Sequence, residues 1–158
     1  MIVRPLHPAE TFYRFITPRW AHTPTSGAGA ARFGGRFNRP GIKALYLSRH
    51  VETAAAEYQQ DDPLIPPGTL VAYRVALSRV VDFQARYIRG LWDELWADWD
   101  CEWRGQAFHE EIEPPSWLFG DLAIMGTMAA HPLTFIIIGL LRSTLDPDEL
   151  ARQGTLKF

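Results

Sequence analysis

The segment best suited to chemistry is residues 31–41, ARFGGRFNRPG, in which arginines alternate with aromatic residues around a glycine pair. The pair that ends at Gly35 lets backbone amides approach a phosphate closely, and the planar forks of Arg32 and Arg36 suit phosphate oxygens. The ring of Phe37 could stack on a base or on nicotinamide. This combination favours a dinucleotide-binding loop over its alternative, a surface turn with solvated arginines. The spacing matches neither a Rossmann fingerprint nor a P-loop.

Two glutamates lie on the helix that apolar spacing predicts at about residues 50–60. Glu52 and Glu57 are five positions apart, which places them roughly 140° apart around a helix axis. They therefore flank the apolar stripe on opposite sides, and the spacing leaves open which one faces a cleft. The alternative interpretation for either residue is a carboxylate on the solvated face of the helix.

The elements that would position these groups are short strands and helices. Runs of β-branched and aromatic residues predict strands at residues 11–16, 69–81 and 133–141, and a short apolar run predicts a buried strand at residues 44–48. A further helix is predicted over residues 117–125, with Ser116 as the N-cap, and residues 146–149 are predicted to open a short final helix, with Asp146 at the cap. Residues 18–41 contain too much glycine for a helix and are predicted to form one long functional loop.

Tryptophans dominate the segment between residues 92 and 103. Their spacing predicts one face of a helix, formed by Trp92, Leu95, Trp96, Trp99 and Trp103. Such a stripe is typical either of a core or of a surface that binds a partner protein.

Composition limits the class of protein. The 158 residues are 47% hydrophobic and 13% aromatic, which predicts a single domain over residues 1–158 with an aromatic-rich core. A net charge of −2 provides no basic field for a nucleic acid. Nearly all the positive charge is arginine, and this bias favours a phosphate-bearing ligand.

The cysteine, the apolar segments and the histidines indicate the cellular location and whether a metal site is expected. The single cysteine, Cys101, excludes an internal disulfide and favours a reducing, cytoplasmic location. We expect no signal peptide, and the longest apolar stretch is about half of what a membrane span needs. The histidines lack the spacing of metal ligands, so no metal site is expected.

Taken together, these segments resemble the RES domain. The resemblance rests on SGAGAARFGGRFN at residues 26–38, Gly41, ALYLS at 44–48 and ETAAAE at 52–57. They are similar to the family's Gly-Gly-Arg-Trp-Asn loop, its tyrosine strand and its helix that ends in glutamate. The PPSW sequence at residues 114–117, followed by Gly120 and Asp121, resembles the later helix entry of the family.

The resemblance implies an α+β fold similar to ADP-ribosyltransferases, with mixed sheets and flanking helices in one compact domain. It also implies a toxin that consumes NAD⁺ as its substrate and is held in check by a cognate antitoxin protein. Some members hydrolyse or phosphorolyse NAD⁺, and others are thought to transfer ADP-ribose to a protein such as phosphoribosyl pyrophosphate synthetase. For this chain we expect mono-ADP-ribosyl transfer to a protein. The alternatives are an NAD⁺ glycohydrolase or phosphorylase, and a weakly catalytic NAD-binding or interaction module.

Site residues also follow from the resemblance, in which Arg36 matches the loop arginine, Tyr46 the strand tyrosine, Glu57 the helix glutamate and Arg14 an upstream arginine. We expect Glu57, Glu52 and Tyr46 to be catalytic. We expect NAD⁺ to be bound by Arg36, Arg32, Arg14, Gly35, Phe37, Ser48 and Thr127. Ser48 is two residues beyond Tyr46 on one strand and therefore faces the same side, where it could bind the ribose.

Two positions depart from the family pattern. Phe37 replaces the usual loop tryptophan, which keeps a ring but loses the indole N–H donor. The family's C-terminal serine has no direct counterpart, and both Thr127 and Ser143 are candidates to supply its hydroxyl.

Overall fold

The structure, a computed structural model, describes residues 2–60, 62–127 and 135–138. Four strands and four α-helices are joined by two 3-10 helices within these ranges. They follow in the order β1 Val3–Ile16, η1 Pro18–Trp20, α1 Ala28–Phe33, β2 Ala44–Leu47, α2 Val51–Gln59, β3 Thr69–Val81, η2 Glu94–Trp96, α3 Trp103–Phe108, α4 Pro115–Thr127 and β4 Phe135–Ile138. The predicted α+β class is confirmed.

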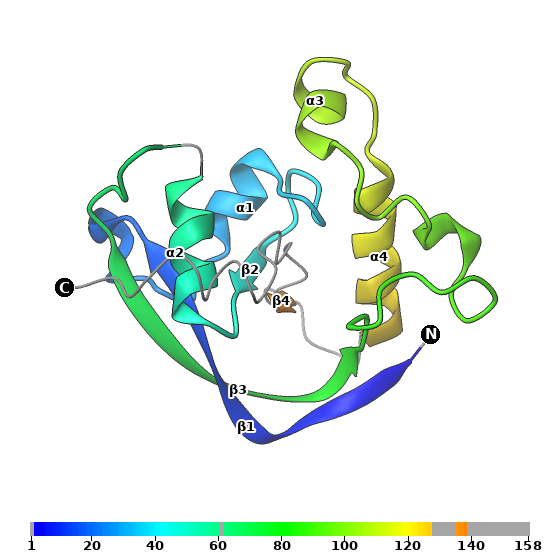
Figure 1. The fold of residues 1–158 in the computed structure, drawn as a ribbon, viewed down its shortest axis with the longest axis horizontal. Coiled ribbons are helices and arrows are strands. Elements are labelled where there is room, and N and C mark those ends of the chain that lie inside the picture. The colour runs from blue at the N-terminus through cyan, green and yellow to red at the C-terminus, as the bar shows by residue number, and fades with distance from the viewer. Residues whose placement is uncertain (1, 61, 128–134, 139–158) are drawn as a thin grey trace, which may run out of the picture.

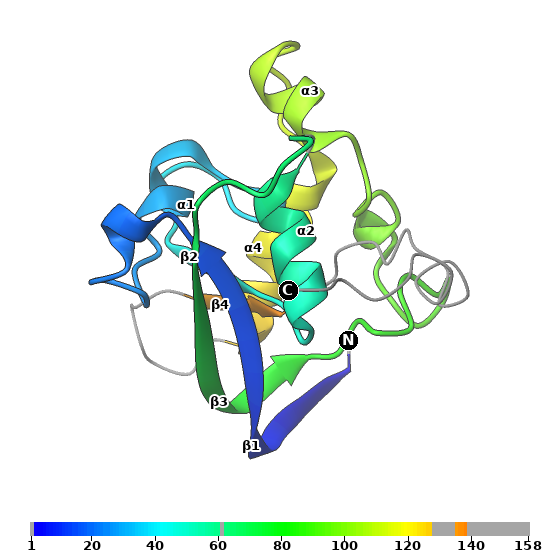
Figure 2. The same ribbon diagram turned by 60° about the vertical axis from the view of Figure 1, so that its left-hand side comes forward.

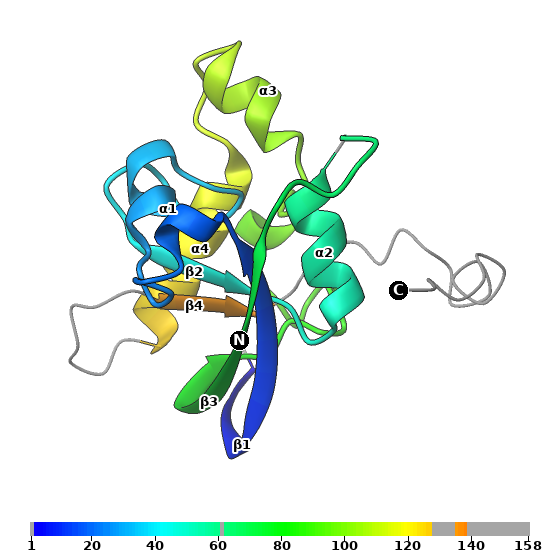
Figure 3. The same ribbon diagram turned by 90° about the vertical axis from the view of Figure 1, so that its left-hand side faces the viewer.

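The strands form two pairs of opposite kind. β1 and β3 make a long antiparallel ribbon in which Phe12 lies opposite Tyr73 and Arg14 opposite Val71. β2 pairs in parallel with β4. Figures 1 and 3 show α2 and α4 on opposite sides of the β2–β4 pair, while the ribbon curves beneath it. The predicted mixture of strand directions is therefore confirmed.

Two apolar clusters lie on either side of β2. Leu45 and Leu47 pack with residues of the β1–β3 ribbon, namely Leu6, Phe12 and Val75. Tyr46, between them in sequence, packs against an aromatic cluster formed by Phe37, Phe83, Trp92, Trp96, Trp99 and Phe119. Successive side chains of a strand point to opposite faces, so β2 serves both clusters at once. Figure 2 shows the β1–β3 ribbon extending below α2 and α4.

The tryptophan segment does not form the predicted continuous helix. Only Glu94–Trp96 is helical before α3 begins at Trp103, and the side chain of Asp93 accepts a hydrogen bond from the Leu95 N–H at the start of that turn. Trp92, Trp96 and Trp99 are buried in the aromatic cluster. Spacings of three and four residues also bring side chains together across successive turns, so the helix prediction is wrong while the core interpretation holds for these three.

The long loop predicted over residues 18–41 is also wrong in part, because it contains η1 and the short helix α1. The glycines that argued against a helix lie mainly at the ends of α1. Gly27 is its N-cap, and Gly34, with φ of 74°, ends it and donates its N–H to Ala30 O. Left-handed backbone after a helix favours glycine, so these residues bound the helix instead of preventing it.

Other predicted boundaries change as follows. The first strand begins at Val3, eight residues before the predicted start. α4 begins at Pro115, which puts Ser116 inside the first turn and not at the N-cap. Phe135–Ile138 confirms part of the last predicted strand, whereas the predicted helix at residues 146–149 lies outside the described residues. Within the described ranges, no helix is long and apolar enough to cross a membrane.

Candidate active site

A partly buried hydrogen bond joins the end of β2 to α2. The hydroxyl of Ser48 donates to Oε1 of Glu57 across 3.0 Å. Ser48 is only 1% exposed and Glu57 is half-buried, on the same side of α2 as the buried Ala54. Backbone hydrogen bonds in both directions connect Ser48 to Tyr13 of β1, at 2.9 and 2.7 Å. These backbone hydrogen bonds fix the position of Ser48 relative to β1.

Arg14 of β1 provides the positive charge near this carboxylate. Burial raises the pKa of Glu57 above its usual range, and the Ser48 hydrogen bond and the charge of Arg14 oppose that rise. Burial likewise lowers the pKa of Arg14, against the influence of Tyr73 and Glu57. No hydrogen bond or ion pair connects the Arg14 guanidinium to another described residue. Its donors are thus available to an anionic ligand.

Tyr73 of β3 is a neighbour of Arg14 that the sequence motifs did not single out. The register places Tyr73 opposite Phe12, on the same face of the ribbon as Arg14. Its hydroxyl donates to Pro24 O across 2.6 Å, which attaches the segment before α1 to β3. Burial raises the pKa of Tyr73 while Arg14 lowers it. Strand alternation in residues 69–81 was the only signal in the sequence that could have placed this residue.

The glycine-arginine loop, defined as residues 34–39, is held from one side by Tyr46. The Tyr46 hydroxyl accepts from the Phe37 N–H at 3.1 Å and donates to Asn38 Oδ1 at 2.7 Å. Burial raises the pKa of Tyr46 to about 12, so the hydroxyl keeps the proton that it donates. A Cβ on Gly35 would lie 2.6 Å from this oxygen. Glycine at position 35 is therefore required by the close approach of Tyr46.

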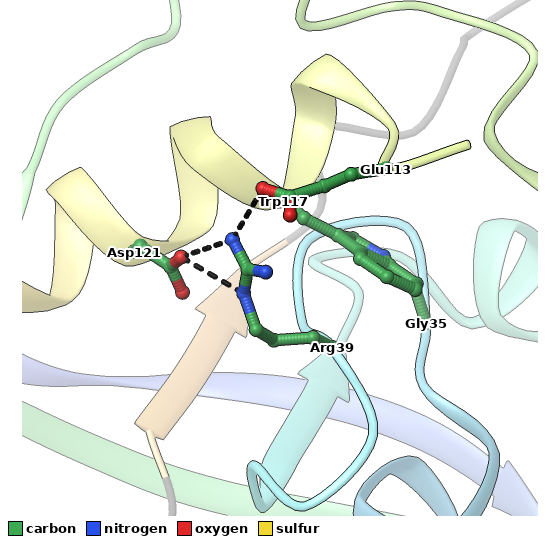
Figure 4. A network of polar contacts seen from close by, with 5 residues as sticks. All are labelled: Gly35, Arg39, Glu113, Trp117 and Asp121. Carbon is green, nitrogen blue, oxygen red and sulfur yellow. Dashed lines mark hydrogen bonds and ion pairs between the residues drawn. The ribbon is translucent and has the colours of Figure 1, made fainter. Parts of the chain in front are cut away.

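Helix α4 holds the glycine-arginine loop from the other side (Figure 4). The indole N–H of Trp117 donates to Gly35 O across 2.8 Å. Arg39 donates to Asp121 at 2.7 and 3.0 Å and to Glu113 at 2.7 Å, and these hydrogen bonds raise its pKa. Arg39 thus fixes the loop to α4, a structural role that its sequence context did not reveal.

Arg36 and Phe37, the two side chains of this loop expected to contact a dinucleotide, differ in their exposure and contacts. Arg36 forms an ion pair with Asp100 at 3.0 Å, and its side chain is 25% exposed. The Phe37 ring is 2% exposed and packs against Phe119 at a centroid distance of 5.1 Å. This burial leaves no open face of the ring and argues against the expected stacking of Phe37 on a ligand.

Three other predicted site residues lie on α1, α2 and α4. Arg32 is exposed on α1, with its guanidinium 5.0 Å from the Phe33 ring centre. Glu52 is exposed on α2, so it is Glu57 that turns inward. Thr127 is the last residue of α4 and its side chain lies outside the described part, as does Ser143. Among the described residues, no group of three or more His, Cys, Asp or Glu side chains is arranged to hold a metal ion.

β2 connects the two halves of this arrangement. Tyr46 supports the glycine-arginine loop, and Ser48, two residues further, contacts Glu57. Residues i and i+2 of a strand share a face, so loop and carboxylate lie along the same side of β2. In this arrangement the positive charge of Arg14 lies near the Glu57 carboxylate.

Comparison with known proteins gives one match. The family model described as RES domain matches residues 11–133. The match contains the glycine-arginine loop, β2, α2 and the described part of α4. No curated protein and no solved structure matches the chain.

Proposed function

The chain belongs to the RES domain family, which is associated with NAD-related toxin–antitoxin proteins, and we propose that it is a toxin that transfers ADP-ribose from NAD⁺ to a protein acceptor. Its cognate antitoxin would be a protein partner. The reaction would break the bond between N1 of nicotinamide and C1′ of ribose.

That bond breaks with its electron pair going to nicotinamide, which leaves as a neutral molecule. The ribose is left with positive charge shared between C1′ and the ring oxygen, as in glycoside hydrolysis. No proton has to be donated to the leaving group. The protein must therefore orient the dinucleotide and place negative charge near the ribose.

The observation that carries the proposal is the Glu57 carboxylate, half-buried, held by Ser48 and close to the charge of Arg14. A carboxylate removed from water stabilises a nearby cation more strongly than one in solvent. The proposed role of Glu57 is to bind ribose hydroxyls and to stabilise the cationic transition state.

The arginines would hold the pyrophosphate. Arg14 has donors without a partner among the described residues, and Arg36 lies within the glycine-arginine loop, where it is ion-paired with Asp100. Tyr46 would act mainly by supporting this loop, because its hydroxyl is engaged by Phe37 and Asn38.

The exposure of Glu52 favours transfer to a protein over attack by water. Glu52 lies on the solvent side of α2, where an incoming protein side chain could reach it. It would accept the proton that the acceptor loses as its nucleophilic atom bonds to C1′. A glycohydrolase or phosphorylase has no need of an exposed base at a protein-docking edge.

Incubation of the purified protein with NAD⁺, with free nicotinamide as the readout, tests the proposal. Glu57→Gln should lower nicotinamide release about 10²- to 10³-fold, the usual effect of losing one group that stabilises transition-state charge. It should also relieve growth arrest when the chain is expressed without an antitoxin. If Glu57→Gln keeps full activity and Glu52→Gln has none, the two roles are exchanged.

Radiolabelled NAD⁺ added to a cell lysate distinguishes the acceptors. Glu52→Gln should abolish labelling of a protein target while slow nicotinamide release continues. Rapid NAD⁺ loss without a labelled protein band would exclude the transferase and favour the glycohydrolase or phosphorylase. Absence of any NAD⁺ cleavage together with retained NAD⁺ binding would indicate a binding module.

A further inference from the structure

The hydroxyl of Ser48, the group that a ribose would need, is already engaged in a hydrogen bond. Its single hydroxyl proton points to Glu57 Oε1, and the residue is 1% exposed. A substrate hydroxyl would have to displace the carboxylate from a position that solvent does not reach. The expected contact between Ser48 and ribose is therefore disfavoured by the geometry.

The burial of Ser48 and its hydrogen bond to Glu57 suit a residue that orients the carboxylate. We propose that Ser48 is a positioning residue, which holds the Glu57 carboxylate in its reactive orientation from the end of β2. This inference rests on the proposed function, because it explains how the proposed catalytic carboxylate is fixed.

Backbone hydrogen bonds hold Ser48 in place, so that its hydroxyl can orient the Glu57 carboxylate. Ser48 exchanges two hydrogen bonds with Tyr13, and Tyr13 is paired with Ala72 across the β1–β3 ribbon. A glutamate side chain has three rotatable bonds and loses considerable freedom when it is ordered. A donor fixed to two strands can hold it in place before substrate arrives, which is the condition for strong electrostatic stabilisation.

The charges around Glu57 show why a neutral donor is needed as well as an arginine. Arg14 on β1 is the charged group that acts on Glu57, and Tyr73 on β3 acts in turn on Arg14. No ion pair joins Arg14 to Glu57. Within the described residues, the Glu57 carboxylate accepts one hydrogen bond, from the Ser48 hydroxyl. Arg14 remains available for the pyrophosphate, while Ser48 orients the acid.

Ser48→Ala tests this role, with Ser78→Ala, an exposed serine of β3, as the control. Nicotinamide release by Ser48→Ala should fall about tenfold at neutral pH, the effect of losing one hydrogen bond to a charged group, and KM for NAD⁺ should stay near the original value. Removing a donor that favours the ionised carboxylate raises the Glu57 pKa, so the acid limb of the rate profile should move to higher pH. Ser78→Ala should change none of these quantities.

A double-mutant cycle separates positioning from general damage to the fold. If Ser48 acts through Glu57, the Ser48→Ala change should have no further effect on nicotinamide release in a Glu57→Gln protein. A raised KM with unchanged kcat would overturn the proposal and restore Ser48 as a ribose ligand. Additive losses in the cycle, or a Ser48→Ala rate equal to that of the original protein, would also overturn it.

A measurement without substrate keeps this test independent of the proposed function. Titration of the Glu57 carboxyl carbon by NMR should show a higher pKa in Ser48→Ala than in the original protein. If the original protein releases no nicotinamide, the proposed function fails, yet this shift would still support the Ser48–Glu57 relationship. An identical titration in both proteins would refute it.

Discussion

Gly120 of α4 lies directly against the backbone carbonyl of Phe37 in the glycine-arginine loop. A Cβ built on Gly120 would overlap the carbonyl oxygen and would lie 2.8 Å from the carbonyl carbon. The obstacle is backbone, which cannot rotate away as the end of a side chain can. The contacts of Trp117 and Asp121 with the loop are on the same helix, so they depend on this close approach.

Gly120→Ala should therefore separate the loop from α4. We expect a loss of about 1–3 kcal/mol in the free energy of unfolding, typical of inserting a methyl group into a packed contact. NAD⁺ affinity should fall as well. Denaturant unfolding and calorimetry measure the two effects.

Gly29→Ala provides the matched control for this change. Gly29 lies inside α1, and a Cβ there would meet no atom within 4 Å. Alanine favours a helix over glycine by roughly 0.5–1 kcal/mol, so this variant should be as stable as the original or more stable. Equal stability of both alanine variants would show that α4 does not need its contact with Phe37.

Tyr46→Phe should destabilise the loop from the opposite side. The change removes the acceptor of the Phe37 N–H and leaves that donor unpaired in a part-buried place. We expect a loss of about 1–3 kcal/mol in the free energy of unfolding. Tyr58→Phe is the control, because its hydroxyl donates to Pro67 O at an exposed position where water can replace it. A Tyr46→Phe loss no larger than that of Tyr58→Phe would contradict this structural role.

Local patterns in the sequence predicted the strand–helix order around β2 and carried the resemblance to the family, and that resemblance implied the α+β class. A short apolar run indicated the strand Ala44–Leu47, alternation indicated Thr69–Val81, and helical spacing indicated α2. It also placed Glu52 and Glu57 on opposite sides of the apolar stripe. Which glutamate turns inward depends on Ser48, whose position relative to α2 is a tertiary property.

The expectations from the sequence that were wrong or missing also depend on tertiary contacts. Phe37 was expected to face a ligand, but the packing of α4 and its Phe119 turned the ring into the core. Arg39 resembled its neighbours Arg32 and Arg36 in the sequence, and only the distant carboxylates of Glu113 and Asp121 give it a structural role. Tyr73 lies outside every motif and is near Arg14 because of the β1–β3 register. Contacts between residues far apart in sequence have no local signal.

Glu57→Gln should stabilise the fold at neutral pH. Burial raises the pKa of Glu57, so the folded state binds a proton more readily than the unfolded state and the ionised form opposes folding. The original protein should lose this part of its stability as pH rises from the ordinary glutamate pKa through the folded one. Glutamine cannot ionise, so the variant should melt a few degrees higher at pH 7 and at the same temperature near pH 3. A stability gain that is equal at both pH values would contradict this explanation.

The ion pair between Arg36 and Asp100 places a carboxylate at the guanidinium that is proposed to bind pyrophosphate. The two side chains are 25% and 34% exposed, so the pair contributes only about 0–1 kcal/mol. An incoming pyrophosphate could therefore replace Asp100, with a corresponding loss of affinity. The aspartate would then act as a weak internal competitor for the NAD⁺ site.

Two substitutions with opposite expected effects test this competition. Asp100→Asn removes the competing charge and should tighten NAD⁺ binding by up to about fivefold, the equivalent of about 1 kcal/mol. Arg36→Lys keeps the charge but cannot form two parallel bonds to a phosphate, so it should weaken binding roughly tenfold. Calorimetric titration with NAD⁺ in a Glu57→Gln background measures both without consuming the ligand. Arg4→Lys, which alters a surface ion pair with Asp82 of similar length, 2.9 Å, is the control and should bind NAD⁺ unchanged. If Asp100→Asn weakens binding, Asp100 orients Arg36 and does not compete for it, and an unaltered dissociation constant in Arg36→Lys would remove Arg36 from the pyrophosphate site.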